Sequence, residues 1–349
     1  MQQCPNCGCG KIKQVGCKTK LVNDFPDDTS KRIETIAYVI WDGWCKRCNL
    51  TFWAPEPTLQ GTSFGPRALG VIMEYFYKKN TDSTIAYYFE ALYGFSISEN
   101  AIRNAVTALS CKFRPTYDGI LEHIAQSPSI HFDESTIKMD GKTGYIWLVT
   151  VSSATYLLAK QSRSKRVLLE NFNILFDVPV VTDGYASYNL FHTRQRCWIH
   201  LLLKAEKYAI RNRGTDLSCY RRLLFLYNEI KDLKSASTSE CLRLQRKVMD
   251  IAYGYPKKHK FRTTLENASP YLFTFLQHPG MLPHNNPAEL EVRDCIVLHR
   301  NVRHQLPTDN AREVFSVLIS VARTCQKQGT FPHAAVESLM DDSQLEFIS

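Results

Sequence analysis

Two short apolar runs that each end in aspartate, Ile130-His131-Phe132-Asp133 and Pro179-Val180-Val181-Thr182-Asp183, decide the fold of this chain. Between them, the apolar pattern predicts strands over 145–151 and 155–160 and a helix over 165–172. A short helix over 187–192 and a fifth strand over 196–200 are expected after the second run. Strands that alternate with helices in this way are typical of an α/β domain.

The order of these elements is three strands, a helix, a strand, a helix and a strand, which is the order of a ribonuclease-H-like domain. We therefore predict an α/β fold with a ribonuclease-H-like catalytic domain over 129–332. From His200 the pattern is helical, with breaks at Gly214, 254–256 and 279–280, so a helical insertion is expected over about 201–280. A helix is expected to begin at Asn286, and an amphipathic helix to cover 311–328. Residues 333–349 form an acidic tail, with Glu337, Asp341, Asp342 and Glu346.

Asp133 and Asp183 are expected at the carboxyl ends of their strands, where an α/β sheet binds its ligands. On neighbouring strands, both carboxylates would project into one site, and divalent cations would relieve their repulsion. Phosphodiester chemistry uses two such ions roughly 4 Å apart. Taken singly, each aspartate is better explained as the cap of a following turn.

Glu289 has a strong local explanation of its own. In Asn285-Asn286-Pro287-Ala288-Glu289, Asn286 is a good N-cap, Pro287 a good first helical residue, and Glu289 stands where a capping-box glutamate belongs. What favours a functional role is the whole arrangement of two strand aspartates followed, after a helical insertion, by a helix glutamate.

Paired cysteines mark a separate module over 1–57, ahead of the other domains. Cys4 and Cys7 form one pair, and Cys45 and Cys48 form the other, which is the pattern of a zinc ribbon with a structural Zn²⁺ held by four thiolates. Cys9 and Cys17 compete as ligands in the first half. A strand is expected over 33–41, and the tryptophans near the second pair (Trp41, Trp44 and Trp53) are interpreted as a small core rather than as base-stacking platforms.

Residues 65–125 are predicted to form a helical, helix-turn-helix-like unit that binds DNA. Ser98 is expected to cap a helix over 99–110 whose buried face carries Ile102, Val106 and Leu109. A helix, a glycine turn and a helix also occur in ordinary packing, and that alternative stays open.

The net charge of +9 suits a polyanionic partner, and its distribution is uneven. Between His200 and Gly280 there are 15 lysines and arginines against 7 aspartates and glutamates. This surface is interpreted either as a set of solvated helix faces or as a contact for DNA phosphates. No signal-peptide pattern and no membrane-spanning run is recognised, so we expect a soluble, intracellular protein without a membrane partner.

Four motifs occur in a diagnostic order: 131–135 (HFDES), 182–185 (TDGY), 197–200 (CWIH) and 285–289 (NNPAE). Together they resemble the transposases of bacterial and archaeal insertion sequences of the insertion-sequence-66 type, a DDE family, over about 61–332. The positions that match the family's metal-binding triad are Asp133, Asp183 and Glu289. Cys197 and His200 match its Cys-x-x-His element, to which we assign no role. His284 and Leu290 depart from the family, which usually has Asp and Arg at these positions.

The resemblance implies a transposase that cleaves double-stranded DNA at the element ends and joins the freed 3′-hydroxyls to target DNA. It further implies Mg²⁺ or Mn²⁺ as cofactor, a homo-oligomer on DNA and a place in the cytoplasm at the nucleoid. Two alternatives stay open: a catalytically inactive, domesticated DNA-binding regulator, and a structure-specific nuclease on the same fold. Tyr185 is interpreted as a DNA contact rather than a nucleophile. His200 is interpreted either as a neighbour of the metal ligands or as a structural histidine.

Overall fold

The computed structural model describes residues 3–27, 30–54, 56–212, 214–297, 300 and 305–340. The chain divides into two compact units, one of residues 1–116 with 317–348 and one of residues 117–316. The boundaries fall inside helices α4 (Arg114–Ala125) and α12 (Asp309–Lys327). Within the described residues, no helix combines the length and the apolar composition that a membrane-spanning segment needs.

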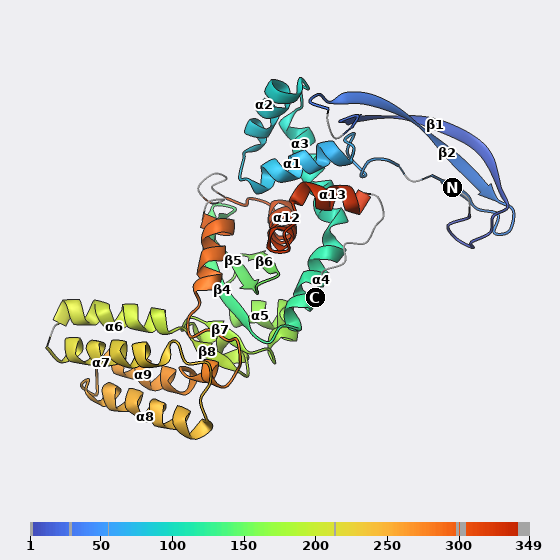
Figure 1. The fold of residues 1–349 in the computed structure, drawn as a ribbon. Coiled ribbons are helices and arrows are strands. Elements are labelled where there is room, and N and C mark those ends of the chain that lie inside the picture. The colour runs from blue at the N-terminus through green and yellow to red at the C-terminus, as the bar shows by residue number, and fades with distance from the viewer. Residues whose placement is uncertain are drawn as a thin grey trace. The chain divides into compact units, whose positions relative to one another are not determined.

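The first unit begins with a three-stranded antiparallel sheet in the order β1-β2-β3 (Figure 1). Strands β1 (Ile12–Asp24) and β2 (Glu34–Cys45) form a long hairpin that pairs Ile12 with Cys45 at one end and Asp24 with Glu34 at the other. Strand β3 (Thr51–Trp53) adds to β2. The sequence pattern indicated only part of β2 and none of β1. Strand β1 was not expected, because its apolar and polar residues do not alternate regularly.

Three helices follow: α1 (Pro66–Tyr77), α2 (Asp82–Tyr93) and α3 (Glu99–Lys112). The expected cap of α3 is confirmed, since the Ser98 side chain accepts the backbone N–H of Ala101 at 3.2 Å. Ile102, Val106 and Leu109 are buried, as their helical spacing predicted.

The start of α1 is capped from outside the helix. Its N-cap, Gly65, has no side chain, and Asp24 at the end of β1 accepts the N–H of Ala68 at 2.7 Å instead. A Cβ at residue 65 would meet Asp24 Oδ2 at 2.2 Å, so this close approach requires glycine. Asp24 thereby ties the hairpin to the helices.

Helix α13 (Pro332–Met340) packs against α1 in the same unit and buries Ala335 and Val336. The sequence pattern suggested an acidic tail from residue 333, and the structure instead has a packed helix as far as Met340. Three of the four acids assigned to that tail, Asp341, Asp342 and Glu346, lie outside the described residues.

The second unit is built on a five-stranded mixed sheet in the order β6-β5-β4-β7-β8. Strands β4 (Ile130–Met139), β5 (Lys142–Thr150) and β6 (Thr155–Lys160) are antiparallel neighbours. Strands β7 (Val180–Thr182) and β8 (Arg194–Arg196) extend the sheet in parallel to β4. The elements between them are α5 (Lys165–Asn171) and the 3₁₀ turns η1 (Asn173–Leu175) and η2 (Ala186–Leu190).

The expected strand over 196–200 is wrong. Strand β8 ends at Arg196, and helix α6 (Trp198–Asn212) begins two residues later. The buried residues of α6 are Trp198, Leu201, Leu202, Ala205 and Ala209, which follow the helical period. The apolar residues at 197–199 fit a strand over a short window, but over a longer window the helical spacing is the stronger pattern.

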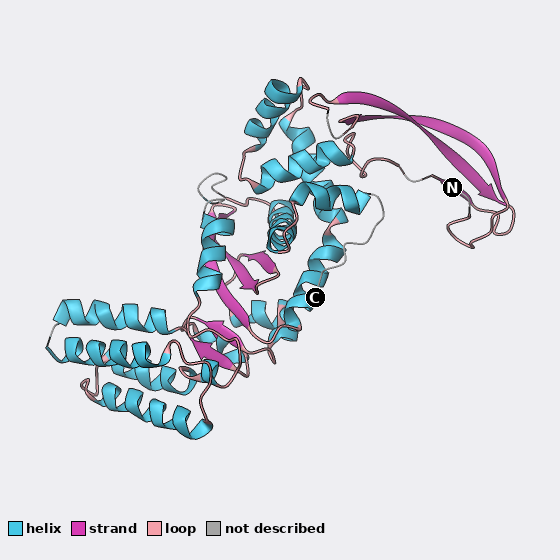
Figure 2. Cartoon of the chain, in the orientation of Figure 1, coloured by secondary structure: helices cyan, strands magenta, loops and turns pink. Residues whose placement is uncertain are grey.

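The insertion is helical, as the sequence predicted, with α6 followed by α7 (Gly214–Ile230), α8 (Thr238–Tyr253) and α9 (Lys260–Ala268) (Figure 2). These helices enclose a core of their own, with Trp198, Leu223, Val248 and Phe261 fully buried. The 3₁₀ turns η3 (Ser269–Tyr271) and η4 (Thr274–Leu276) lead back to the sheet. The chain then forms α10 (Asn286–Glu291) and a π-helical turn, η5 (Val292–Val297). Backbone hydrogen bonds join these elements: the N–H of Cys197, after β8, donates to the Thr182 carbonyl of β7, and the N–H of Trp198 donates to the Pro283 carbonyl ahead of α10.

Candidate functional site

The three acids of the sequence motif lie on three different elements of the second unit. Asp133 is on β4, Asp183 directly follows β7, and Glu289 is on α10. The expectation that Asp133 ends its strand is wrong, because β4 continues to Met139. The parallel register pairs Ile130 with Val180 and His131 with Val181, so two residues further on Asp133 and Asp183 stand at the same level. The two aspartates are therefore neighbours across a parallel strand pair.

Asp133 lies in a region of concentrated negative charge. Burial raises the pKa of its carboxyl to about 7, and the charges of Glu134, Asp183 and Glu289 act in the same direction. The backbone N–H of Glu134 donates to Asp133 Oδ1 at 2.9 Å, which opposes the rise. Because acids that raise one another's pKa destabilise their ionised forms, a cation bound among them would be stabilising.

A buried asparagine holds the glutamate segment against β4. The Asn285 side chain donates to the Phe132 carbonyl at 3.0 Å, and its Oδ1 lies 3.2 Å from His131 Nδ1. Asn285 is completely buried, so both contacts are sheltered from water. They fix the start of α10 beside the strand that carries Asp133.

The capping-box explanation of Glu289 is wrong in its register. The N-cap of α10 is Asn285 rather than Asn286, and no side chain caps the helix. The Glu289 Oε1 atom is buried and, among the described residues, has no hydrogen-bond partner. An unpaired buried carboxylate oxygen is costly, and a bound cation would offset that cost. Carboxylate oxygens are the ligands that Mg²⁺ prefers, so the three acids fit a divalent ion of this kind.

Cys197 and His200 lie beside Glu289. Their ligand atoms and a Glu289 oxygen are all within 4.8 Å of one another, and His200 Nδ1 is 3.6 Å from Glu289 Oε1. Burial raises the pKa of the Cys197 thiol, whose sulfur accepts the backbone N–H of Asn285 at 3.3 Å. Cys197 therefore joins the start of α6 to the start of α10, and His200 is the polar neighbour of the glutamate.

The three carboxylates are spaced more widely than this group. Within the part of the chain that the structure describes, only the four N-terminal cysteines and the Cys197, His200 and Glu289 set bring three or more ligand atoms within 4.8 Å of one another.

Glu134, although adjacent to Asp133, is already paired. Its side chain is 4% exposed and accepts from Arg163 Nε at 2.7 Å and from the hydroxyl of Tyr188. The Arg163 guanidinium lies 3.9 Å from the centre of the Tyr185 ring, and the Tyr185 hydroxyl donates to the Arg163 carbonyl at 2.5 Å. The hydroxyl of Tyr185 is thus engaged, which agrees with the interpretation that it is not a nucleophile.

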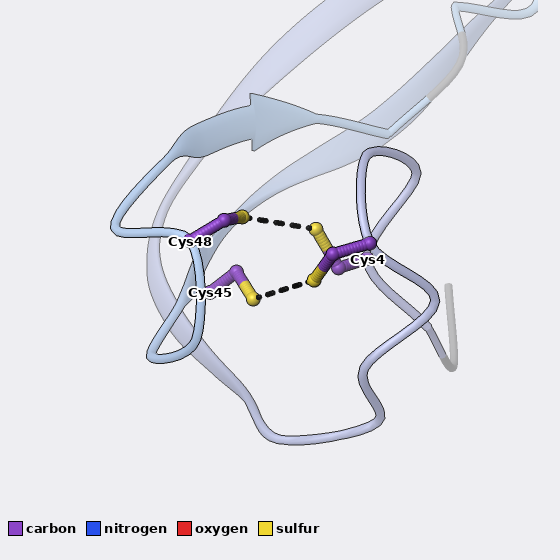
Figure 3. A group of neighbouring side chains, drawn as sticks. Cys4, Cys45 and Cys48 are labelled. Carbon is purple, nitrogen blue, oxygen red and sulfur yellow. Dashed lines mark hydrogen bonds between the residues drawn. The ribbon is translucent and has the colours of Figure 1, made fainter.

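The four cysteines of the first unit form a second cluster, shown in Figure 3. The sulfurs of Cys4, Cys7, Cys45 and Cys48 all lie within 4.8 Å of one another, and the Cys4–Cys48 and Cys7–Cys45 sulfur pairs are each 3.6 Å apart. Four thiolates at about 2.3 Å from a tetrahedral Zn²⁺ would be about 3.8 Å apart, so the cluster has the dimensions of a zinc site. Backbone N–H groups of Cys48 and Arg47 lower the pKa of Cys45, which favours the thiolate that a metal requires.

Both cysteine pairs are held by the same kind of turn. The N–H of Gly8 donates to the Cys4 carbonyl, and the N–H of Asn49 donates to the Cys45 carbonyl, each at 2.9 Å. Gly8 and Asn49 adopt φ values of 67° and 56°, the left-handed region that glycine and asparagine tolerate best. The rivals Cys9 and Cys17 are not part of the cluster: Cys9 accepts the N–H of Lys11, and Cys17 is exposed on β1.

The interpretation of the nearby tryptophans as a small core is wrong for two of them. Trp41 is 51% exposed and Trp53 is 46% exposed, and Lys18 Nζ lies 4.8 Å from the centre of the Trp53 ring. A two-layer core cannot form there because β1, β2 and β3 make a single sheet whose strands are exposed along much of their length.

Several residues near the carboxylates were not identified from the sequence. Arg194 and Arg196 lie on β8 beside the strand that leads to Asp183, and Tyr271 comes from the far end of the insertion. The available signal was the spacing of the two arginines, because residues i and i+2 of a strand share one face. Asn285 stood inside a recognised motif, but nothing local indicated that its side chain would bind to β4.

One family model matches the chain. The model, described as "Transposase IS66 family", covers residues 61–313 and so includes all three acids and the whole insertion, but not the cysteine cluster. No curated protein matches the chain. A match over well over half of the chain, including the acids on β4, directly after β7 and on α10, shows that this protein belongs to the IS66 family of transposases.

Proposed function

We propose that residues 129–332 form a ribonuclease-H-like catalytic domain, interrupted by the helical insertion, which carries out DNA transposition. The proposal is supported by the chain order β4-β5-β6-α5-η1-β7-η2-β8, in which the last strand covers 194–196 in place of the expected 196–200. It is supported further by the family match, since transposases as a class cut and move DNA.

In this proposal Asp133, Asp183 and Glu289 hold Mg²⁺ or Mn²⁺. Bound ions would activate the attacking oxygen and stabilise the leaving oxygen of the phosphodiester. The chain itself supplies the alignment. The parallel strands set the two aspartates side by side, Asn285 holds the start of α10 on β4, and His200 orients the Glu289 carboxylate.

The reaction would first cleave each element end by hydrolysis and then join the freed 3′-hydroxyl to target DNA. Glu134 takes no part as a ligand, because Arg163 and Tyr188 already occupy its carboxylate. It contributes negative charge next to Asp133 and anchors Arg163 near Tyr185.

The observation that carries this proposal is the burial of Asp133 close to Asp183 and Glu289; burial raises its pKa to about 7, and the charges of these acids act in the same direction. The test is cleavage and joining of labelled element-end DNA by the full chain and by Asp133→Asn. We expect Asp133→Asn to bind the ends as the unaltered protein does but to lose cleavage in both Mg²⁺ and Mn²⁺. Asp140→Asn, an exposed change in the turn between β4 and β5 whose left-handed backbone suits asparagine, serves as the matched control and should cleave normally.

The outcomes separate the alternatives. Cleavage that persists in Asp133→Asn refutes the assignment of this residue. Cleavage by the unaltered chain with no joined product indicates a structure-specific nuclease. Specific binding with neither cleavage nor joining indicates a DNA-binding regulator.

We further propose that the cysteine cluster is a structural zinc ribbon. The distances between the sulfurs and the two matching turns support a tetrahedral ion held by Cys4, Cys7, Cys45 and Cys48. Zinc would stabilise the end of a hairpin that has little apolar core of its own.

DNA contact is proposed for two surfaces. On the insertion, Arg221, Arg222 and Lys247 from α7 and α8 line one surface hollow together with Glu229 and Asp250, and the excess of basic side chains supports phosphate binding there. In the first unit, α2 and α3 form the helix-turn-helix-like pair, with Gly94 in the left-handed region at the end of α2. A homo-oligomer on paired element ends, acting at the nucleoid, completes the proposal.

A further inference from the structure

A cavity of about 380 Å³ opens directly beside Asp183 in the second unit. Its walls come from the segment after β7, from β8 and from the end of the insertion. The lining residues that matter here are Asp183, Gly184, Asn189, Arg194, Arg196 and Tyr271. Pockets for small ligands typically measure about 300–1,000 Å³, so this cavity has room for a nucleotide.

The charges in this cavity are unbalanced. Arg194 and Arg196 occupy the same face of β8, and neither forms an ion pair with any carboxylate in the described part of the chain. Burial lowers the pKa of the Arg196 guanidinium, the positive charge of Arg194 lowers it further, and Asp183 partly offsets both effects. Two guanidinium groups that repel each other beside a single aspartate favour a bound anion.

Arg194 is held in place but remains incompletely paired. Its guanidinium lies 4.1 Å from the centre of the Tyr271 ring, and one of its NH₂ groups donates to Asn189 Oδ1. Its Nε atom is buried and, in the described part of the chain, has no hydrogen-bond partner. Since buried donors are normally satisfied, this N–H is a candidate contact for a ligand oxygen.

Gly184 shapes the cavity wall. A Cβ at this position would meet Arg196 Nη2 at 1.8 Å, so only glycine lets the guanidinium lie against the backbone next to Asp183. The arginine is thereby placed within the cavity instead of being displaced from it.

We propose that this cavity binds one nucleotide of the DNA strand held at the carboxylates, with its phosphate on Arg194 and Arg196. The inference rests on the proposed function for the identity of the DNA, but not on the cleavage step. Guanidinium groups are the side chains best suited to phosphate oxygens. With Asp183 engaged by a divalent ion, as proposed above, the two arginines would face the phosphate without a competing negative charge.

The first test uses a single nucleotide. Thymidine 3′,5′-bisphosphate is titrated into the full chain by calorimetry, in buffer without divalent ions. We expect saturable binding that Arg194→Gln weakens by roughly tenfold, as loss of a charged hydrogen bond does. The matched control is Arg166→Gln, which removes an equal charge from the same unit at an 82% exposed side chain already paired with Glu170, and it should bind normally.

The second test uses the element-end duplex, again without divalent ions, over a series of salt concentrations. Loss of one phosphate contact should reduce the slope of log K against log salt by about 0.9 in Arg194→Gln, and not in the control. Gly184→Ala, which displaces Arg196 without removing a charge, should weaken binding as well. If Arg194→Gln does not give a normal circular dichroism spectrum and cooperative melting, the result for Gly184→Ala decides the test.

The two proposals fail in distinguishable ways. Equal affinity and equal salt slope for Arg194→Gln, Gly184→Ala and the unaltered chain overturn the nucleotide cavity, even if the unaltered chain cleaves DNA. Nucleotide binding that depends on Arg194, in a chain that never cleaves DNA, supports the cavity and overturns the catalytic assignment.

Discussion

Replacement of Asp133 by asparagine should make the metal-free protein more stable at alkaline pH while removing its response to magnesium. The native pKa of Asp133, about 7, lies above the value of 3.8 for an unperturbed aspartate. Between these two values the native state binds more protons than the unfolded state, so stability falls as pH rises from about 4 to about 7. Asparagine carries no charge at any pH, and its Oδ1 can still accept the Glu134 N–H, so the variant should escape this loss.

The size of the effect follows from the same shift. A rise of about three pKa units corresponds to about 4 kcal/mol, which is an upper bound for the gain of Asp133→Asn at pH 8. Asp133 retains some access to solvent, and screening by water and salt should reduce the measured gain to about 2 kcal/mol. At pH 4 the two proteins should differ little, because Asp133 is then largely protonated in the native state.

Urea unfolding from pH 4 to pH 8 in magnesium-free buffer measures this difference. No chelator is added, so any zinc stays in the cysteine cluster. The control Asp140→Asn should show the same dependence of stability on pH as the unaltered protein. Added Mg²⁺ at about 100 times its Kd should stabilise the unaltered protein by about 2.7 kcal/mol and Asp133→Asn by much less. The reasoning is refuted if the stability of Asp133→Asn depends on pH in the same way as that of the unaltered protein. It is also refuted if magnesium stabilises both proteins equally.

Three other changes give measurable outcomes. Cys48→Ser should lose the bound zinc, measured by atomic emission after gel filtration, whereas Cys9→Ser should keep it, and equal zinc content in the two would contradict the assigned ligand set. Asn285→Ala should lower the free energy of unfolding by about 1–3 kcal/mol and weaken Mn²⁺ binding, because the Phe132 carbonyl and His131 both lose their buried contact. An unchanged Mn²⁺ affinity, measured by calorimetry, would argue against the positioning role of Asn285. Glu134→Gln should lower the free energy of unfolding by about 1–3 kcal/mol, because its pairing with Arg163 is lost. It should also move the pH midpoint of metal binding downward, because the charge of Glu134 no longer raises the pKa of Asp133, and an upward shift would contradict this.

Features that depend on neighbouring residues were predictable from the sequence. The helices of the insertion and α12 follow the spacing of their apolar residues, and Ser98 caps α3 as its position before an apolar run suggested. The paired cysteines likewise predicted which sulfurs meet, because two residues between cysteines suit a turn that directs both sulfurs to one point.

The errors arose where a local pattern supported two structures. Cys197, Trp198 and Ile199 are apolar in sequence, so a window of five residues suggested a strand, yet the spacing from Trp198 to Ala209 belongs to a helix. The polar residues that follow Asp133 likewise suggested that the strand ends there, whereas antiparallel pairing with β5 carries β4 onward to Met139.

The sequence by itself determined the order of the motifs and the family to which those motifs point. Only the tertiary structure decided that Asp133 and Asp183 stand level on parallel strands, that Asn285 binds the backbone of Phe132, and that Tyr271 lies over Arg194. The physical reason is the range of the interactions. Helical periodicity, capping and cysteine turns act over a few residues, whereas these contacts join positions about 50 to 150 residues apart, which come together only when sheet register and core packing place their elements.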